Sequence, residues 1–163
     1  MNTKKLLIGS FYAAALSICA FQAYAQEQRP SYGAQVTVDQ AKKLAAGALA
    51  EAKKNNWNVA IAIVDTSGAL VYYERMEDAQ SASPGIAIEK ARTSAMFRRP
   101  TRAFQDAINK AGSTATLGLP GATPIAGGLP IVLGGKIGGA IGVSGVTADQ
   151  DEQIARAGLD SMK

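Results

Sequence analysis

The sequence predicts a single α+β domain in which an antiparallel sheet is flanked by helices. Residues 57–76 form two β-type runs joined by a tight turn, which is typical of a hairpin. Residues 129–143 repeat this arrangement around a glycine pair. Amphipathic segments with helix-capping sequences lie before, between and after these hairpins. Local hairpins combined with helices are characteristic of the α+β class.

The first 25 residues are expected to be a secretory signal peptide that is not part of the fold. Lys4 and Lys5 form a short positive region, residues 6–21 are mostly apolar, and residues 23–25 (AYA) have the pattern of a cleavage site. The apolar run is too short for a permanent transmembrane helix, so no stable membrane insertion is expected. Cleavage after Ala25 places the mature protein in the periplasm or outside the cell.

The composition of the mature chain excludes several kinds of site. Histidine is absent, and the single cysteine, Cys19, lies in the signal sequence, where a lipidation box is the alternative interpretation. The mature chain then has no disulfide, no thiolate nucleophile and no Cys/His zinc site. Loss of Lys4 and Lys5 lowers the formal charge of +4 by two. This weak charge, without a block of like residues, predicts neither nucleic-acid binding nor a polybasic membrane patch.

The domain is expected to span residues 36–163 and to follow a polar, flexible lead at residues 26–35. A capping box at residues 37–40 (TVDQ) opens the first helix. Apolar residues then recur at helical spacing until an Asn-Asn pair at residues 55–56 ends this helix.

The first hairpin consists of a buried strand over residues 57–65 (WNVAIAIVD), a turn, and a return strand over residues 69–76 (ALVYYERM). Ser83 is expected to cap the second helix, with Pro84 at its first helical position. Pro100 is expected to end that helix, because the residue before a proline avoids helical geometry.

The C-terminal half begins with a short third helix over residues 101–112. Two glycine-rich strands follow at residues 129–133 and 137–143, with a hairpin turn at residues 134–135. These glycines do not predict a nucleotide-binding loop, because no Lys-Ser pair follows them and they lie within strands. A second capping box at residues 147–150 (TADQ) opens the final helix.

Three carboxylates, Asp149, Asp151 and Glu152, cluster at the start of the final helix. The helix dipole favours negative charge at this position. A calcium loop is not indicated, because the spacing of its oxygen ligands and its central glycine are missing. We therefore expect these carboxylates to have a structural role or to contact another subunit.

The most informative stretch for function is residues 89–101 (EKARTSAMFRRPT). Its cations surround an apolar pair, a composition that suits an anionic, flat and partly apolar ligand. Arginines pair with carboxylates through charge-assisted hydrogen bonds, although a basic helix end also matches the helix dipole. The candidate ligand-binding side chains in and next to this stretch are Met96, Phe97, Arg98, Arg99 and Arg102.

The chain resembles the GlcG/HbpS-type haem-binding family, also described as the haem-degrading domain family (DUF336). The resemblance rests on VAIAIVDTSGALVYYERM, IEKARTSAMFRRPT, PGATPIAGGLPIVLGGKIGGAIGVSG and DQDEQIARAGL, which occur in this order in the mature chain. It implies a profilin-like α+β fold, assembly into a homo-oligomer, and haem as the cofactor. For some secreted members it also implies a sensor or receptor protein as a partner, and other members lie beside glycolate or diol catabolism genes.

The resemblance also implies a contact to the haem iron. In one secreted branch of the family, the threonine of the Pro-Thr pair after the second helix is implicated at the iron, and Thr101 matches it. Another branch uses a histidine, which this chain lacks. A threonine hydroxyl is a poorer iron ligand than imidazole, thiolate or phenolate, so we expect weakly ligated and exchangeable haem. Met96 and the tyrosines are substitute ligands to consider.

Three functions remain open from the sequence. The first is a periplasmic or secreted protein that sequesters, carries or senses haem without catalysis. The second is an accessory protein that binds a small carboxylate, such as a hydroxy acid, with the same arginines. The third is an enzyme for haem degradation or for a lyase or isomerase step, with Lys90 or Glu89 as the first candidates for proton transfer.

Overall fold

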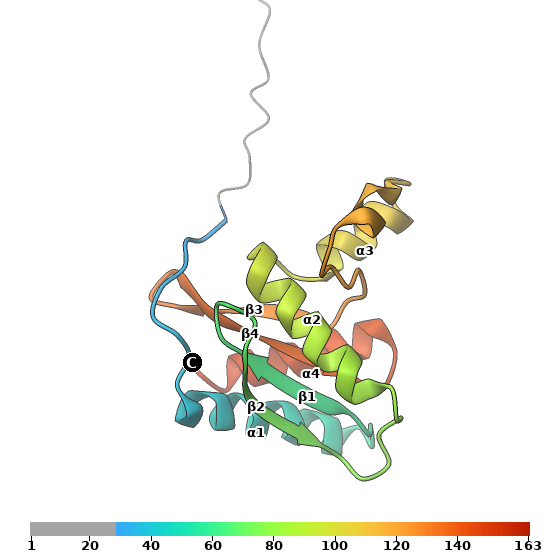
Figure 1. The fold of residues 1–163 in the computed structure, drawn as a ribbon. Coiled ribbons are helices and arrows are strands. Elements are labelled where there is room, and N and C mark those ends of the chain that lie inside the picture. The colour runs from blue at the N-terminus through green and yellow to red at the C-terminus, as the bar shows by residue number, and fades with distance from the viewer. Residues whose placement is uncertain (1–28) are drawn as a thin grey trace, which may run out of the picture.

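The computed structural model describes residues 29–163, so the expected signal peptide and Cys19 lie outside the described residues. In chain order the elements are α1 (Val38–Lys54), β1 (Ala60–Val64), β2 (Leu70–Arg75), α2 (Ser83–Phe97), α3 (Arg102–Asn109), the 3-10 helix η1 (Thr114–Gly118), β3 (Gly128–Leu133), β4 (Lys136–Ser144) and α4 (Ala148–Asp160). The four strands form one antiparallel sheet in the order β2-β1-β4-β3. Helices α1 and α4 pack on one face of the sheet, and α2 crosses the other (Figure 1). The predicted α+β fold with flanking helices is confirmed.

Both predicted capping boxes are present. Thr37 Oγ1 accepts a hydrogen bond from Gln40 N at 3.2 Å, and Gln40 Oε1 accepts one from Thr37 N at 2.9 Å. Thr147 and Gln150 form the same pair of bonds at the start of α4, at 3.3 and 3.1 Å. The two helices on this face of the sheet therefore begin where side chains satisfy their first N–H groups.

The two predicted hairpins join through their inner strands. Within β1, Ile61 lies opposite Glu74 of β2 and opposite Val143 of β4. The second hairpin turns at Gly134 and Gly135, whose φ angles of 55° and 77° glycine adopts most readily. Because β1 and β4 are central, β2 and β3 are the two edges of the sheet.

The start of α2 differs from the prediction. Ser83 is the first helical residue and is buried, while Ala82 occupies the cap position without a side-chain hydrogen bond. The Ser83 N–H donates to Gln80 O at 2.9 Å, so the turn before the helix satisfies this one N–H group while no side chain caps the helix. The helix ends at Phe97, and Pro100 lies beyond its end as predicted.

The segment between α2 and β3 projects from the body of the domain (Figure 1). The observed α3 is shorter than the helix predicted over residues 101–112. Gly112 takes a positive φ of 62°, and its N–H donates to Ile108 O at 3.1 Å, which closes the helix end. In and after η1, Leu117 and Leu119 are exposed.

Side-chain alternation along β1 divides the core into two layers. Ile61 belongs to the layer under α1 and α4, whereas Ala60 and Ala62 belong to the layer under α2. The second layer is built almost entirely of alanines, which lets α2 lie close to the strands. At Gly142 the approach is closest, because a Cβ there would lie 2.1 Å from Ala87 O of α2. Glycine is therefore required at this position of β4.

A buried ion pair joins α2 to α4 past the end of the sheet. Lys90 Nζ lies 2.7 Å from Asp151 Oδ2, and the two side chains are 1% and 2% exposed. The same ammonium donates to Val143 O at 3.1 Å, and Asp151 Oδ1 accepts from Val146 N at 3.2 Å. Burial raises the pKa of the Asp151 carboxyl, and the nearby Lys90 ammonium opposes this rise.

Two consecutive glycines make room for Lys90: Gly127 borders its side chain and Gly128 its backbone. A Cβ at Gly127 would lie 2.9 Å from both Lys90 Nζ and Asp151 Cβ. A Cβ at Gly128 would lie 2.3 Å from Lys90 O. Gly127 therefore leaves room for the ion pair, and Gly128, the first residue of β3, allows the close packing of α2.

Removal of either partner of this ion pair is expected to destabilise the fold strongly. Lys90→Met leaves a buried carboxylate without its counter-charge, and Asp151→Leu leaves a buried ammonium. Each variant should lose about 3–5 kcal/mol of unfolding free energy, and the double variant should lose much less than their sum. Urea unfolding followed by circular dichroism measures the unfolding free energies of the parent, the two single variants and the double variant. Lys110→Met, which breaks an exposed pair with Asp106, is the control and should change little. Additive losses at Lys90 and Asp151 would contradict direct coupling.

Candidate ligand-binding pocket

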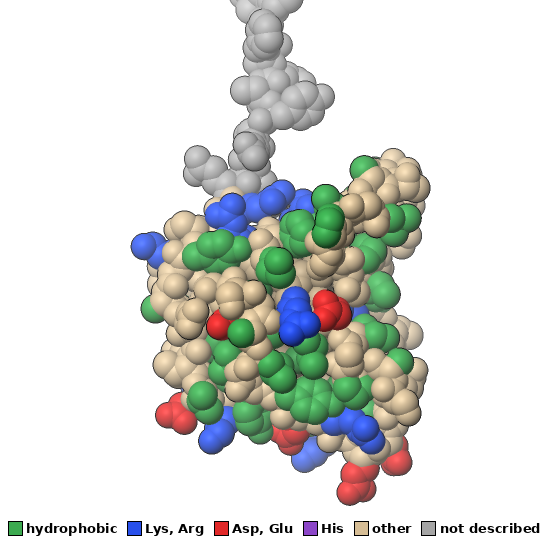
Figure 2. All heavy atoms as spheres, in the orientation of Figure 1, with side chains coloured by type: hydrophobic (Ala, Val, Ile, Leu, Met, Phe, Trp, Pro, Cys, Tyr) green, Lys and Arg blue, Asp and Glu red, His purple; other side chains and the backbone are tan. Residues whose placement is uncertain are grey.

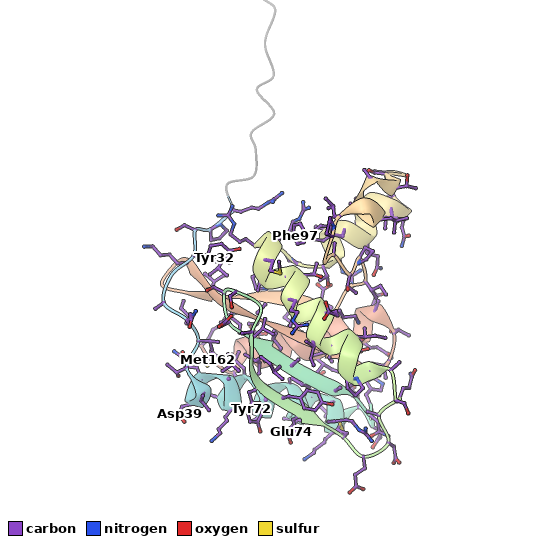
Figure 3. All side chains as sticks on the ribbon, viewed as in Figure 1. Tyr32, Asp39, Tyr72, Glu74, Phe97 and Met162 are labelled. Atoms are coloured by element: carbon purple, nitrogen blue, oxygen red, sulfur yellow. The ribbon has the colours of Figure 1, made fainter. Side chains whose placement is uncertain are left out.

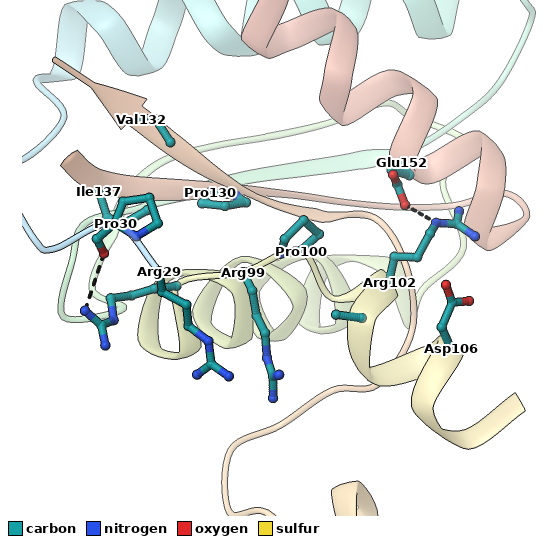
Figure 4. A pocket seen from close by; sticks show the side chains of 12 residues that line it. Arg29, Pro30, Arg99, Pro100, Arg102, Asp106, Pro130, Val132, Ile137 and Glu152 are labelled. Carbon is teal, nitrogen blue, oxygen red and sulfur yellow. Dashed lines mark hydrogen bonds and ion pairs between the residues drawn. The ribbon is translucent and has the colours of Figure 1, made fainter. Parts of the chain in front are cut away.

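A pocket of about 440 Å³ opens where the end of α2 meets edge strand β3 (Figure 4). This volume lies in the range of about 300–1,000 Å³ that is usual for small-molecule sites. Four arginines line it: Arg29, Arg98, Arg99 and Arg102. Its apolar lining consists mainly of Pro30, Pro100, Pro130, Val132 and Ile137. Figure 2 shows Lys and Arg side chains gathered at this end of the molecule, beside the start of the described chain.

Arg98 is held at the rim by the local backbone. It ends α2 in the left-handed conformation, with a φ of 54°, and its N–H donates to Ala95 O at 3.3 Å. Its guanidinium lies 5.4 Å from the centre of the Tyr32 ring and donates to Pro30 O at 3.4 Å. Within residues 29–163 no carboxylate pairs with Arg98. Its charge is therefore available to an anionic ligand.

Arg99 is held by aromatic packing. Its guanidinium carbon lies 4.0 Å from the centre of the Phe104 ring, a cation–π arrangement. Phe104 is fully buried and meets Phe97 edge to face, with the ring centres 5.2 Å apart. The side chains of Arg29 and Arg99 extend in the same direction from the pocket in Figure 4. Phe97 thus supports the Phe104 ring on which the Arg99 guanidinium lies.

Arg102 differs from the other arginines because its charge is already balanced. It donates from Nε to Glu152 and from Nη2 to Asp149 Oδ1 at 2.6 Å. The hydrogen bond to Glu152, followed by the one to Asp149, raises the pKa of the Arg102 guanidinium. Glu152 also accepts from Arg156 at 2.9 Å. This network ties α3 to the start of α4, so Asp149 and Glu152 have the structural role expected of them, while contact with another subunit stays a prediction.

Thr101 is fully buried between α2 and α3. Its Oγ1 accepts a hydrogen bond from Gly128 N at 2.9 Å and donates to Gly128 O at 3.4 Å. The Thr101 N–H also donates to Gly128 O, at 3.0 Å. These contacts fasten the α2–α3 junction to the start of β3. A haem iron would reach the hydroxyl only after this junction opened.

The other two predicted contacts also lie outside the pocket lining. Met96 is half exposed, and its Sδ lies 3.7 Å from where a Cβ on Gly68 would sit, beside the β1–β2 turn. Phe97 packs on Phe104. The structure therefore brings Arg98, Arg99 and Arg102 together in one pocket and leaves Met96, Phe97 and Thr101 outside its lining. Ligand binding by all six residues stays a prediction.

Arg29 and the residues of β3 that line the pocket were not predicted from the sequence. Arg29 lies in the lead before the domain, whose described part runs along β4, where Gly33 N donates to Ile137 O at 2.9 Å. No local pattern shows that pairing. The signal that could have indicated the pocket is Pro130, because a proline inside a strand marks a sheet edge. On this edge Val132 is 49% exposed, unusual for a large aliphatic residue in a strand.

The candidates for proton transfer lie away from this pocket. Lys90 is enclosed by its ion pair, and Glu89 pairs with Arg92 at 2.7 Å. Within residues 29–163 no cluster of three His, Cys, Asp or Glu side chains is arranged to hold a metal ion. None of the helices in this part of the chain combines the length and the apolar character needed to cross a membrane.

A second pocket of about 420 Å³ lies on the α1–α4 side of β3. Leu44, Leu159 and Met162 contribute to its lining. Its cations, Arg156 and Lys163, each pair with a carboxylate of α4. The second pocket therefore has apolar surface without the unpaired charge that Arg98 gives the first.

Known proteins of similar sequence point to one family. A family model described as "Haem degrading protein HbpS-like" matches residues 36–160. Protein GlcG of Escherichia coli strain K12 is 45% identical over 94 residues, which cover 58% of this chain and 69% of GlcG. An uncharacterized 15.0 kDa protein from the dhaT-dhaS intergenic region of Citrobacter freundii is 38% identical over 130 residues, or 78% of this chain and 92% of that protein.

Solved structures agree with the sequence comparisons. The crystal structure of HbpS superposes with a TM-score of 0.74 at 30% identity and covers 82% of this chain and 94% of HbpS. The Klebsiella pneumoniae protein ORFY gives a TM-score of 0.73 at 30% identity, with coverage of 80% and 93%. A complex of PduOC with haem gives a TM-score of 0.71 at 25% identity, with coverage of 78% and 94%.

Thr101→Val is expected to lower the unfolding free energy by about 1–3 kcal/mol, because the buried N–H of Gly128 loses its acceptor while the side-chain shape is kept. Thr114→Val, at an exposed position in η1, is the matched control and should stay within about 0.5 kcal/mol of the parent. Urea unfolding measures both. Equal stability of the two variants would mean that the Thr101 hydroxyl does not hold the junction.

Proposed function

Because this chain belongs to the HbpS-like family, we propose that it binds haem and that the arginine-lined pocket at the end of α2 is its site. One observation carries the proposal: Arg98 and Arg99 stand beside an apolar floor that includes edge strand β3. Haem combines two carboxylates with a large apolar face. The pocket offers a partner for each part in one place.

The residues present suit the edge and the face of a haem. A propionate at Arg98 would meet a guanidinium that no carboxylate of the described chain balances. Stacking on Phe104 holds the Arg99 side chain in place, so less side-chain entropy is lost on binding. Pro130 and the half-exposed Val132 offer rigid apolar surface that a macrocycle would cover.

A small hydroxy acid fits this pocket less well than haem does. The arginines would serve its carboxylate equally. Its few atoms would, however, leave the apolar surface of Pro130, Val132 and Ile137 in contact with water. Haem accounts for both the charge and the apolar surface of the pocket.

We further propose that the protein acts in the periplasm or outside the cell as a homo-oligomer. The expected signal peptide supports this location, and a mature chain without cysteine suits an oxidising compartment. Sequestering, carrying or sensing haem for a partner protein fits better than catalysis, because neither Lys90 nor Glu89 lines the pocket.

Protein comprising residues 26–163 is expected to bind haemin saturably, with a change in the Soret absorbance. Arg98→Ala should weaken this binding about tenfold or more, because it removes a charge-assisted hydrogen bond to a propionate. Titration at fixed ionic strength, followed by absorbance, measures both dissociation constants.

Lys163→Ala is the matched control, because it removes a cation of the second pocket that already pairs with Asp160. It should leave haemin affinity unchanged. Weakening by Lys163→Ala alone would move the haem to the second pocket. No saturable change with haemin, combined with thermal stabilisation by glycolate, would replace haem with a small organic acid.

A further inference from the structure

We propose that the pocket recognises a porphyrin by its carboxylates and its apolar face and not by its metal. The ligand class is then the tetrapyrrole dicarboxylates, with or without iron. This inference rests on the proposed haem site. It predicts more than haem binding alone does, because metal-free porphyrin should bind about as tightly as haemin.

The pocket lacks the side chains that hold haem iron in most proteins. Those ligands are imidazole, thiolate, thioether and phenolate. The sequence contains no histidine, and its one cysteine precedes the described residues. In the described part of the chain, the methionines and tyrosines all lie outside the pocket lining.

The sulfur and phenol groups nearest along the chain are already placed elsewhere. Tyr32 donates its hydroxyl to Ala95 O at 3.1 Å and to Met96 O at 2.9 Å, beside the end of α2 (Figure 3). A phenolate at iron would give up both bonds and leave two terminal helix carbonyls without this donor. The Met96 side chain lies towards the turn at Gly68.

Two carboxylates, those of Asp106 and Glu152, also line the pocket, and both already have partners. Asp106 pairs with Lys110 at 3.0 Å, and Glu152 accepts from Arg102 and Arg156. The Thr101 hydroxyl is buried and bonded to Gly128. Ligation of iron by Glu152 or Thr101 would break an interaction that holds α3 or the α2–α3 junction, and the carboxylate of Asp106 is not among the usual ligands of haem iron.

What remains for recognition is independent of the metal. Arg98 and Arg99 would bind the two propionates, and Pro130 and Val132 would contact the ring face. A charge-assisted hydrogen bond from a guanidinium to a propionate has the same strength whether or not the ring holds iron. Contact between an apolar face and a proline depends equally little on the metal.

The test compares four ligands on protein comprising residues 26–163, with fluorescence quenching of the single tryptophan, Trp57, as the common readout. The ligands are haemin, protoporphyrin IX, zinc protoporphyrin IX and protoporphyrin IX dimethyl ester. The three free acids should bind with dissociation constants within about threefold of one another. The ester should bind at least about tenfold more weakly, and Arg98→Ala should weaken the acids but not the ester.

Each other outcome overturns a different statement. Haemin binding more than about tenfold tighter than protoporphyrin binding would overturn metal independence and keep the haem site, with Tyr32→Phe and Met96→Leu as the variants that locate the ligand. Equal binding of ester and acid would overturn carboxylate recognition. Failure of all four ligands to bind would overturn the proposed function itself.

Discussion

The buried ion pair between Lys90 and Asp151 is the constraint on which the architecture depends. A buried ammonium without a carboxylate partner is strongly destabilising. The Lys90–Asp151 contact therefore fixes α2 and α4, which lie on opposite faces of the sheet, relative to each other. The ion pair fits only because Gly127 carries no side chain there, and Gly128 lets the backbone of α2 approach β3. The alanine layer and Gly142 then keep α2 pressed on the strands. The position of the end of α2, and with it the pocket, follows from this packing.

The charges of the molecule divide into balanced and available ones. Lys90 and Arg102 are fully engaged with carboxylates and fasten α2, α3 and α4 together. Arg98 instead stands at the rim on a left-handed residue, against an aromatic ring and a backbone carbonyl. A site that binds an anion needs available cations such as Arg98. The balanced cations hold the helices that carry them in place. The edge strand adds apolar surface, because Pro130 and Val132 line this pocket as well as the second one.

Local sequence signals predicted the fold well. Both capping boxes, the Gly134-Gly135 turn and the two hairpins depend on neighbouring residues, and the structure contains them all. The cap predicted at Ser83 was wrong because Ser83 is already the first helical residue and Ala82 occupies the cap position. Only arginines of the candidate site were predicted, and its apolar lining was not. The arginines stand in one stretch of sequence, but their apolar counterpart comes from an edge strand and from a lead whose pairing with Ile137 no local pattern reveals.

A crystal structure of the protein with zinc protoporphyrin IX tests the central claim most directly. The account predicts a macrocycle lying on Pro130 and Val132, with its carboxylates at Arg98 and Arg99 and no protein side chain on the zinc. A macrocycle in the second pocket, beside Leu44 and Met162, would contradict the proposed site. A protein side chain on the zinc would contradict recognition that ignores the metal.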